Sequence, residues 1–335
     1  MVLAPLAGGP STPELTAAVV DAGGFGFLAA GYLSAEVTRQ RVARTRALTA
    51  GRFGVNLFVP GEPSNPDLVA HYAERLAPEA AALGVDLGDA RFDDDDWDGK
   101  LGVLLEEPPA AVSFTFGCPP EPVIRQFRDA GAEVWVTITT PLEAVAAESA
   151  GADVLVAQGS EAGGHRGTWR DDDPYVRGIG LLALVQLVRA HTALPVVAAG
   201  GIATGGAIAA ALAVGASAAA VGTAFLLCPE AGTAEVHRAA LAGDAPTALT
   251  RAFTGRLARG IRNRMLDELT DVAPSGYPEI HHLTAPIRQA GRDAGVGDVV
   301  NLWAGEAYQL AEAAPAAAVM ARLVRELDAV SRPPL

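Results

Sequence analysis

Cationic side chains and cysteine are scarce in this sequence. Its 25 Lys and Arg residues face 39 Asp and Glu residues, so the formal net charge is −14 at pH 7. A field of this sign repels phosphate backbones and anionic lipids, and we therefore expect neither a nucleic-acid partner nor a membrane. The two cysteines, Cys118 and Cys228, match no metal-ligand spacing, and a secreted protein of this size would usually carry several. We expect a cytoplasmic protein without a metal site.

Long apolar runs and lysine are also missing. The longest apolar stretch, 207–227, is rich in alanine and is broken by Gly215 and Gly222, and the first ten residues contain no basic side chain. Neither a membrane span nor a signal peptide is therefore expected. Lys100 is the only lysine, which we attribute to codon bias because arginine can take its place on a surface. With 335 residues, half of them hydrophobic, the chain can bury a large core, which excludes wholesale disorder.

Short apolar runs alternate with helical patterns along the first 230 residues. The runs span residues 2–4, 25–28, 53–58, 111–115, 133–138, 153–157, 195–198 and 218–221. The helical stretches between them include 12–22, 35–48, 120–130, 141–150, 178–191 and 204–214. Eight such units predict an α/β fold of the (β/α)₈ TIM-barrel type. The competing fold is a doubly wound nucleotide-binding sheet, but residues 7–10, AGGP, do not fit the G-x-G-x-x-G turn that it requires.

Two segments depart from this alternation of strands and helices. Residues 60–109 exceed one βα connection and contain an acidic cluster at 93–98. We expect that cluster to form an exposed loop with at most weak cation binding, because like charges repel one another. Beyond the barrel the repeat is lost, and 235–335 is read as helices and loops. We therefore expect a barrel core over 1–230 and a helical C-terminal extension over 231–335, which packs on the barrel or forms a lid.

Glycines follow the last two predicted strands, where barrels of this type commonly bind phosphate. Gly200 and Gly201 follow the seventh run, and Gly222 and Thr223 follow the eighth. Glycine lets backbone N–H groups approach an anion closely, and a helix beginning near Thr223 would add a hydroxyl and a favourable dipole. The two turns predict a phosphate site, although the glycines at 200 and 201 could also serve only to turn the chain.

The sixth run leads into residues 158–167, QGSEAGGHRG, the most specific stretch in the sequence. Glycines on both sides of His165 allow the loop to bend tightly, and histidine is a proton acceptor near neutral pH. At the C-terminal end of a barrel strand, this predicts a catalytic base rather than a surface histidine. We assign no role to the other histidines, which are His71, His191, His237, His281 and His282. The adjacent pair has no third ligand at a metal-binding spacing.

An amide and the first loop complete the predicted barrel mouth. Asn56, in the third run, can both donate and accept hydrogen bonds, as a flavin ring edge or a ribityl hydroxyl requires, but it could equally close a turn. The first loop contains Pro5, Leu6 and Ala7, followed by a pair of glycines that permits close backbone contact.

Together these motifs resemble the nitronate monooxygenase family, formerly called 2-nitropropane dioxygenases. The resemblance rests on the first loop with STPEL after it, and on GVNLF, GSEAGGHRG, AAGGIATG and VGTAFL. It runs from about residue 2 to residue 227 and continues more weakly to the C-terminus. The same superfamily includes flavin-dependent enoyl-acyl-carrier-protein reductases and NAD(P)H:quinone reductases. The resemblance therefore implies the TIM barrel and bound FMN more directly than it implies the reaction.

Carried over residue by residue, the resemblance implies an FMN site with His165 as the catalytic base. The residues that would bind FMN are Pro5, Leu6, Ala7, Asn56, Gln158 and Gly163, and at the phosphate Gly200, Gly201, Gly222 and Thr223. Two features depart from the family pattern. Leu6 stands where the family usually has Met, and the chain starts only a few residues before the first loop. A first strand truncated in this way would mean a misassigned start codon or a barrel closed differently at its base.

The resemblance implies an FMN-dependent monooxygenase that oxidises alkyl nitronates, such as propionate 3-nitronate, with O₂ to a carbonyl compound and nitrite or nitrate. His165 would remove the α-proton when a neutral nitroalkane is offered. Two alternatives stay open: an NAD(P)H-dependent reductase of quinones or enoyl thioesters, and a flavin-binding barrel without catalysis. The expected partners are a small-molecule substrate and O₂, and whether the chain forms a homo-oligomer stays open.

Overall fold

Eight parallel strands close into a barrel in this computed structural model, which describes residues 1–171 and 178–331. In order around the barrel, the strands are β1 (Val2–Leu3), β2 (Phe25–Ala29), β3 (Phe53–Phe58), β4 (Ala111–Thr115), β5 (Glu133–Ile138), β6 (Val154–Gln158), β8 (Val196–Ala199) and β9 (Ala218–Val221). Each of the eight predicted runs forms one of them, which confirms the predicted TIM barrel. Although β1 has two residues, Val2 pairs with Phe25 of β2 and with Ala220 of β9, so the ring is closed.

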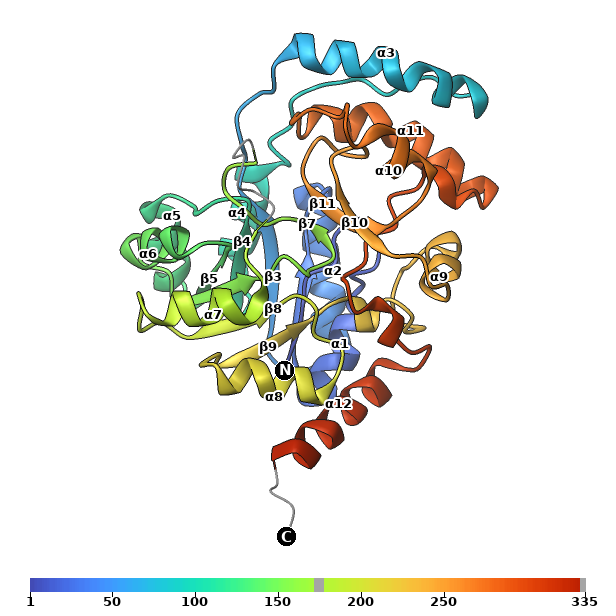
Figure 1. The fold of residues 1–335 in the computed structure, drawn as a ribbon. Helices are drawn as coiled ribbons and strands as arrows, with labels where there is room; N and C mark the ends of the chain where they lie inside the picture. Colours follow the sequence, from blue (N-terminus) through green and yellow to red (C-terminus); the bar gives the residue numbers. More distant parts are fainter. Residues whose placement is uncertain (172–177, 332–335) are drawn as a thin grey trace.

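Helices that follow the strands cover the outside of the barrel (Figure 1). They are α1 (Pro13–Asp21), α2 (Ala35–Leu48), α4 (Trp97–Glu106), α5 (Glu121–Asp129), α6 (Pro141–Ala150), α7 (Leu181–Arg189) and α8 (Gly205–Ala213). Polar residues begin several of them: Thr140 and Glu143 form a capping box at α6, and the Thr204 hydroxyl accepts from the backbone N–H of Ala207 at α8. No helix in the described ranges combines the length and the apolar character needed to span a membrane.

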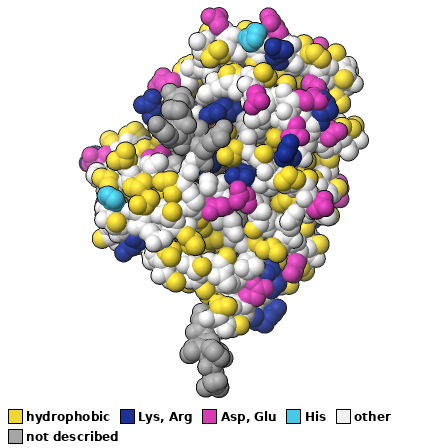
Figure 2. Space-filling view, viewed as in Figure 1, with side chains coloured by type: hydrophobic (Ala, Val, Ile, Leu, Met, Phe, Trp, Pro, Cys, Tyr) yellow, Lys and Arg dark blue, Asp and Glu magenta, His cyan; other side chains and the backbone are white. Residues whose placement is uncertain are grey.

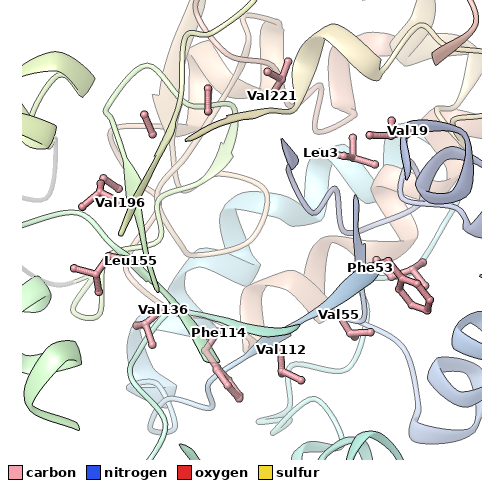
Figure 3. Packing of buried hydrophobic residues seen from close by; sticks show 14 of the residues in the cluster. Leu3, Val19, Phe53, Val55, Val112, Phe114, Val136, Leu155, Val196 and Val221 are labelled. Atoms are coloured by element: carbon pink, nitrogen blue, oxygen red, sulfur yellow. The ribbon is translucent and has the colours of Figure 1, made fainter. Parts of the chain in front are cut away.

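The barrel strands send alternate side chains outward to the helices and inward to the barrel axis. Figure 3 shows part of the outward set, including Val55 and Leu155, which are completely buried. Inside the barrel, Trp135 packs against Phe25 and Phe27, with ring centroids 5.5 and 5.0 Å apart. Because these rings fill the lower part of the interior, the space available to a ligand lies toward the C-terminal ends of the strands.

The C-terminal extension contains two strands in addition to its helices. Its elements are α9 (Glu235–Leu241), β10 (Thr247–Thr250), β11 (Ala258–Ile261), α10 (Arg264–Leu269), α11 (Glu279–Ala294) and α12 (Ala316–Ser331). Strand β11 pairs antiparallel with β10 and with β7 (Gly164–His165), which belongs to the loop after β6. Reading 235–335 as helices and loops missed these strands, because they are short and one partner is far away in the chain. Helix α12 returns along the barrel and packs against α1 and α8 (Figure 1).

Residues 60–109 contain two helices, and the acidic run at 93–98 ends the connection between them. Helix α3 (Pro66–Ala82) packs against α11, away from the barrel wall (Figure 1), and α4 begins within the acidic run. The prediction of an exposed loop is wrong for part of this run, because the side chain of Asp95 is only 17% exposed. A nearby cation explains how the carboxylate is accommodated.

Lys100, the only lysine, is the cation that pairs with this carboxylate. Its side chain is 1% exposed, and its Nζ lies 2.7 Å from Asp95 Oδ2. Burial raises the pKa of Asp95 to about 6, which still leaves the carboxyl ionised at neutral pH. The carboxylates of Asp95 and Asp96 also accept hydrogen bonds from the backbone N–H groups of Tyr32 and Ala35. The acidic run therefore ties Tyr32 and the start of α2 to α4. The lysine has a structural role that codon bias does not describe.

Replacing Lys100 with Met is expected to lower the free energy of unfolding by on the order of 3 kcal/mol, because it leaves a buried carboxylate without its cation. The double variant Lys100→Met/Asp95→Asn should recover at least half of that loss. Urea denaturation of the two variants measures both effects, with Arg44→Met, which breaks an exposed pair with Glu14, as the control for loss of one positive charge. A double variant as unstable as Lys100→Met would contradict the pairing.

Candidate active site

A cavity of about 540 Å³ lies at the C-terminal ends of the barrel strands, between them and the extension. Every residue that the sequence analysis assigned to a site lines it: Pro5, Leu6, Ala7, Asn56, Gln158, Gly163, His165, Gly200, Gly201, Gly222 and Thr223. The volume is typical of small-molecule sites, which measure about 300–1,000 Å³. The fold thus brings together groups that the chain distributes from the first barrel loop to the last.

Backbone donors gather where β8 and β9 end. Gly200 and Gly201 have φ angles of 117° and 67°, a region that residues with a Cβ rarely adopt. The N–H groups of Gly201, Gly222 and Thr223 donate no hydrogen bond within the described chain. Unpaired N–H groups at a cavity wall favour an anion. The glycines therefore both turn the chain and leave donors facing the cavity.

The helix expected at Thr223 is reduced to the three-residue 3₁₀ helix η1 (Thr223–Phe225). The predicted helix dipole is therefore wrong, since so short an element has few aligned peptide units. The Thr223 hydroxyl accepts a hydrogen bond from the backbone N–H of Gly305 at 3.0 Å. Its own proton remains free for an acceptor in the cavity. A Cβ at Gly222 would lie 3.3 Å from the Leu6 side chain, so glycine keeps the first loop close to this wall.

Asn56 and Gln158 line the cavity from β3 and β6 and make different contacts. Asn56 does not close a turn, because it lies within β3; its Nδ2 donates to the hydroxyls of Ser113 and Thr115 at 2.9 and 3.0 Å. Its Oδ1 accepts no hydrogen bond within the described chain. Gln158 instead supports the histidine loop, since Nε2 donates to the His165 carbonyl at 3.0 Å and Oε1 accepts from the Gly167 N–H at 2.8 Å.

His165 is held by the C-terminal extension. Its backbone pairs with Ala258 of β11, and its Nε2 lies 2.9 Å from the hydroxyl oxygen of Thr254. When that hydroxyl donates its proton to the Arg256 carbonyl, 3.3 Å away, it accepts from the imidazole. In this arrangement Nε2 carries the hydrogen and Nδ1 keeps its lone pair. Nδ1 makes no hydrogen bond within the described chain, which leaves it available to a ligand.

Burial lowers the pKa of His165 to about 3, and the cations Arg256 and Arg288 act in the same direction. An imidazolium in this position would lose most of its hydration and would be repelled by both guanidinium groups. The ring is therefore neutral at neutral pH. A neutral ring with one unpaired nitrogen can accept a proton from a bound molecule.

Aromatic residues that the sequence analysis did not single out surround His165. The ring centroids of Phe116, Tyr277 and Trp303 lie 5.7, 5.7 and 5.6 Å from that of the imidazole. Phe116 and Tyr32, which also lines the cavity, have φ angles of 77° and 68°. Non-glycine residues seldom adopt this conformation, and such strain concentrates at functional sites. No sequence pattern marks it, so these residues could not be found from the sequence alone.

Two histidines to which the sequence analysis gave no role, His237 and His281, also line the cavity. Burial lowers the pKa of His237 to about 4 and that of His281 well below its usual value. The His281 ring stacks on Tyr32 with centroids 4.2 Å apart. Across 1–171 and 178–331, no three His, Cys, Asp or Glu side chains are grouped so that they could hold a metal ion. Both imidazoles are therefore uncharged at neutral pH.

Comparisons with known proteins show the family to which the chain is similar. The sequence pattern described as nitronate monooxygenase matches residues 1–326. A nitronate monooxygenase from Pseudomonas aeruginosa is 44% identical over 336 residues, covering 95% of this chain and 93% of that protein. The structure of a nitroalkane oxidase from Streptomyces ansochromogenes superposes with a TM-score of 0.96 at 50% identity, covering 98% of this chain and 96% of that one.

A more distant structure shares the fold. FabK from Thermotoga maritima superposes with a TM-score of 0.76 at 25% identity, covering 98% of this chain and 93% of that one. The resemblance noted in the sequence is therefore confirmed, since the matches extend over nearly the whole chain and not only over its motifs. This chain belongs to the nitronate monooxygenase family, whose members are oxidoreductases.

Proposed function

We propose that FMN is the cofactor of this protein. Family membership implies a flavin, and the residues present fit one that carries a single phosphate. The unpaired N–H groups of Gly201, Gly222 and Thr223 would hold the phosphate. The unpartnered Oδ1 of Asn56 would accept a hydrogen bond from the flavin. The other residues that we propose to contact FMN are Pro5, Leu6, Ala7, Gln158, Gly163 and Gly200.

The substrates that we propose are alkyl nitronates such as propionate 3-nitronate, oxidised with O₂ to a carbonyl compound and nitrite or nitrate. Bound FMN would supply the electron chemistry. The protein would act on these small molecules in the cytoplasm. The observation that carries the proposal is the neutral His165 imidazole, which meets the cavity with one unpaired nitrogen.

His165 is the base that we propose for neutral nitroalkanes. Its Nδ1 would take the α-proton, while the Nε2 hydrogen stays with the Thr254 hydroxyl and holds the ring in place. A preformed nitronate has already lost this proton. Oxidation of the nitronate would therefore need His165 to hold the substrate in position and would depend less on proton removal by His165. The surrounding rings of Phe116, Tyr277 and Trp303 would exclude water from the reacting carbon.

The direct test is oxygen uptake by the FMN-loaded protein with propionate 3-nitronate, beside an anaerobic test for flavin bleaching by NADH or NADPH. We expect rapid oxygen uptake and no bleaching by either nicotinamide. Rapid bleaching without nitronate oxidation would move the assignment to an NAD(P)H-dependent reductase of quinones or enoyl thioesters. Protein that is yellow but inactive in both assays would indicate a flavin-binding barrel without catalysis.

His165→Asn should separate the two kinds of substrate. Losing a general base typically costs about 10²- to 10⁴-fold in rate, so kcat/KM for a neutral nitroalkane should fall by that factor. The loss on the corresponding preformed nitronate should be much smaller, because its proton is already gone. Steady-state kinetics on freshly dissolved nitroethane and on ethyl nitronate measure the two effects. Equal losses on both would contradict the assignment of His165 as the base.

The pH profile for the neutral nitroalkane should lack the inflection of an ordinary histidine. Because burial depresses the pKa of His165 to about 3, the active, unprotonated form persists as the pH falls. We expect kcat/KM for nitroethane to stay constant from pH 8 to pH 5. A base with a pKa near 6.5 would instead lose about 30-fold by pH 5. Circular dichroism at each pH provides the control for unfolding.

A further inference from the structure

One face of α11 carries two arginines to the cavity. His281, Ala285, Arg288 and Arg292 all line it, and their spacing of four, three and four residues places them on one side of the helix. Arg288 is only 5% exposed, whereas Arg292 is half-buried one turn farther along. The helix therefore brings a buried guanidinium group to a cavity whose opposite wall belongs to the barrel.

Arg288 is anchored through part of its guanidinium group and is free on the rest. Its Nε donates to the Thr284 hydroxyl at 3.0 Å, and its Nη2 donates to the His281 carbonyl at 2.7 Å. Its Nη1 donates no hydrogen bond within the described chain. Among the described side chains, Nη1 is not one of the polar atoms that lack both a hydrogen-bond partner and contact with solvent. Because Arg288 lines the cavity, Nη1 is the donor that a ligand there would meet.

Among the described residues, no carboxylate neutralises Arg288 at this wall. The partners of Arg288 are neutral groups of Thr284 and His281, and the described residues that line the cavity include no Asp or Glu. The chain as a whole carries a net charge of −14, and acidic side chains are scattered over the face shown in Figure 2. A buried cation without a counter-charge is costly. An anionic ligand would remove that cost.

The other buried cation near the histidine is already engaged. The guanidinium carbon of Arg256 lies 3.9 Å from the centre of the Phe116 ring, and its nitrogens donate to the carbonyls of Arg166 and Thr168. The rings beside Arg288 carry no charge at neutral pH, since burial raises the pKa of Tyr32 to about 12 and lowers that of His281. Among the residues that the structure describes, Arg288 is therefore the buried positive charge that the cavity presents to a ligand.

We propose that Arg288 binds a carboxylate on the substrate, at the end opposite the nitronate carbon. The inference rests on the proposed function and narrows it to nitronates that carry a second negative group. The Tyr277 ring lies 5.7 Å from that of His165 and 6.3 Å from that of His281, to which Arg288 is bonded. His165 and Arg288 both line the cavity, the first from β7 and the second from α11, so the base and the carboxylate site come from different elements, as a substrate with two functional ends requires.

The test compares propionate 3-nitronate with ethyl nitronate, which has the same reacting group and no carboxylate. Arg288→Met should raise KM for propionate 3-nitronate by roughly 10- to 100-fold, the usual worth of a charged hydrogen bond. It should change KM and kcat for ethyl nitronate by less than about 3-fold, which also shows that the variant is folded. Arg288→Lys, which keeps the charge without the fork, should recover part of the loss. Arg125→Met removes one exposed charge far from the cavity and should match the unaltered protein.

Equal losses on both substrates would overturn the proposal, because Arg288 would then serve the nitronate group or the fold. An unchanged KM for propionate 3-nitronate would overturn it as well. In succinate a second carboxylate replaces the nitronate. Isothermal titration calorimetry can therefore measure its binding without turnover. If the unaltered protein oxidised neither nitronate, the proposed function would fail. Succinate binding that is lost in Arg288→Met but kept in Arg125→Met would still support the carboxylate site, and binding equal in both would exclude it.

Discussion

The cavity depends on the pairing between β7 in the loop after β6 and β11 of the C-terminal extension. This pairing sets the backbone of His165, and the hydroxyl of Thr254, just before β11, meets its ring. Arg166 stabilises the start of the loop after β6, because its completely buried side chain donates to the carbonyl of Gly159. Gln158 bonds to both His165 and Gly167. The barrel thus supplies a rigid platform, and the extension determines where the imidazole stands.

The polarity of the cavity follows from this arrangement. Once the extension covers the barrel mouth, water leaves the side chains between them, and each group takes the charge state that costs least without hydration. The imidazoles of His165 and His281 become neutral, whereas guanidinium groups keep their charge because their pKa is so high. Burial lowers the pKa of Arg288 only to about 10. An acidic protein thereby acquires a cavity that is neutral at its base and positive at one wall, which suits an anionic substrate beside a proton acceptor.

The sequence was sufficient for the parts that depend on local pattern. Apolar runs separated by turns gave all eight barrel strands, and glycines after the last strands led to the cavity wall at Gly201 and Gly222. The sequence was insufficient where a long-range contact decides the structure. Strand β11 forms because β7 offers it a partner, and Tyr32 is held in its strained conformation by neighbours such as Asp95. The face of α11 that carries Arg288 was not predicted, because its meaning depends on knowing that this face meets the cavity.

The central claim is that His165 is a neutral base whose hydrogen sits on Nε2 and whose Nδ1 faces the ligand. The most direct measurement is the ¹⁵N NMR spectrum of histidine-labelled protein between pH 5 and pH 8, with the His165 signals assigned by their loss in His165→Asn. The account predicts a neutral ring throughout this range, with the proton on Nε2. Protonation with a midpoint near 6.5, or a neutral ring with its proton on Nδ1, would contradict it.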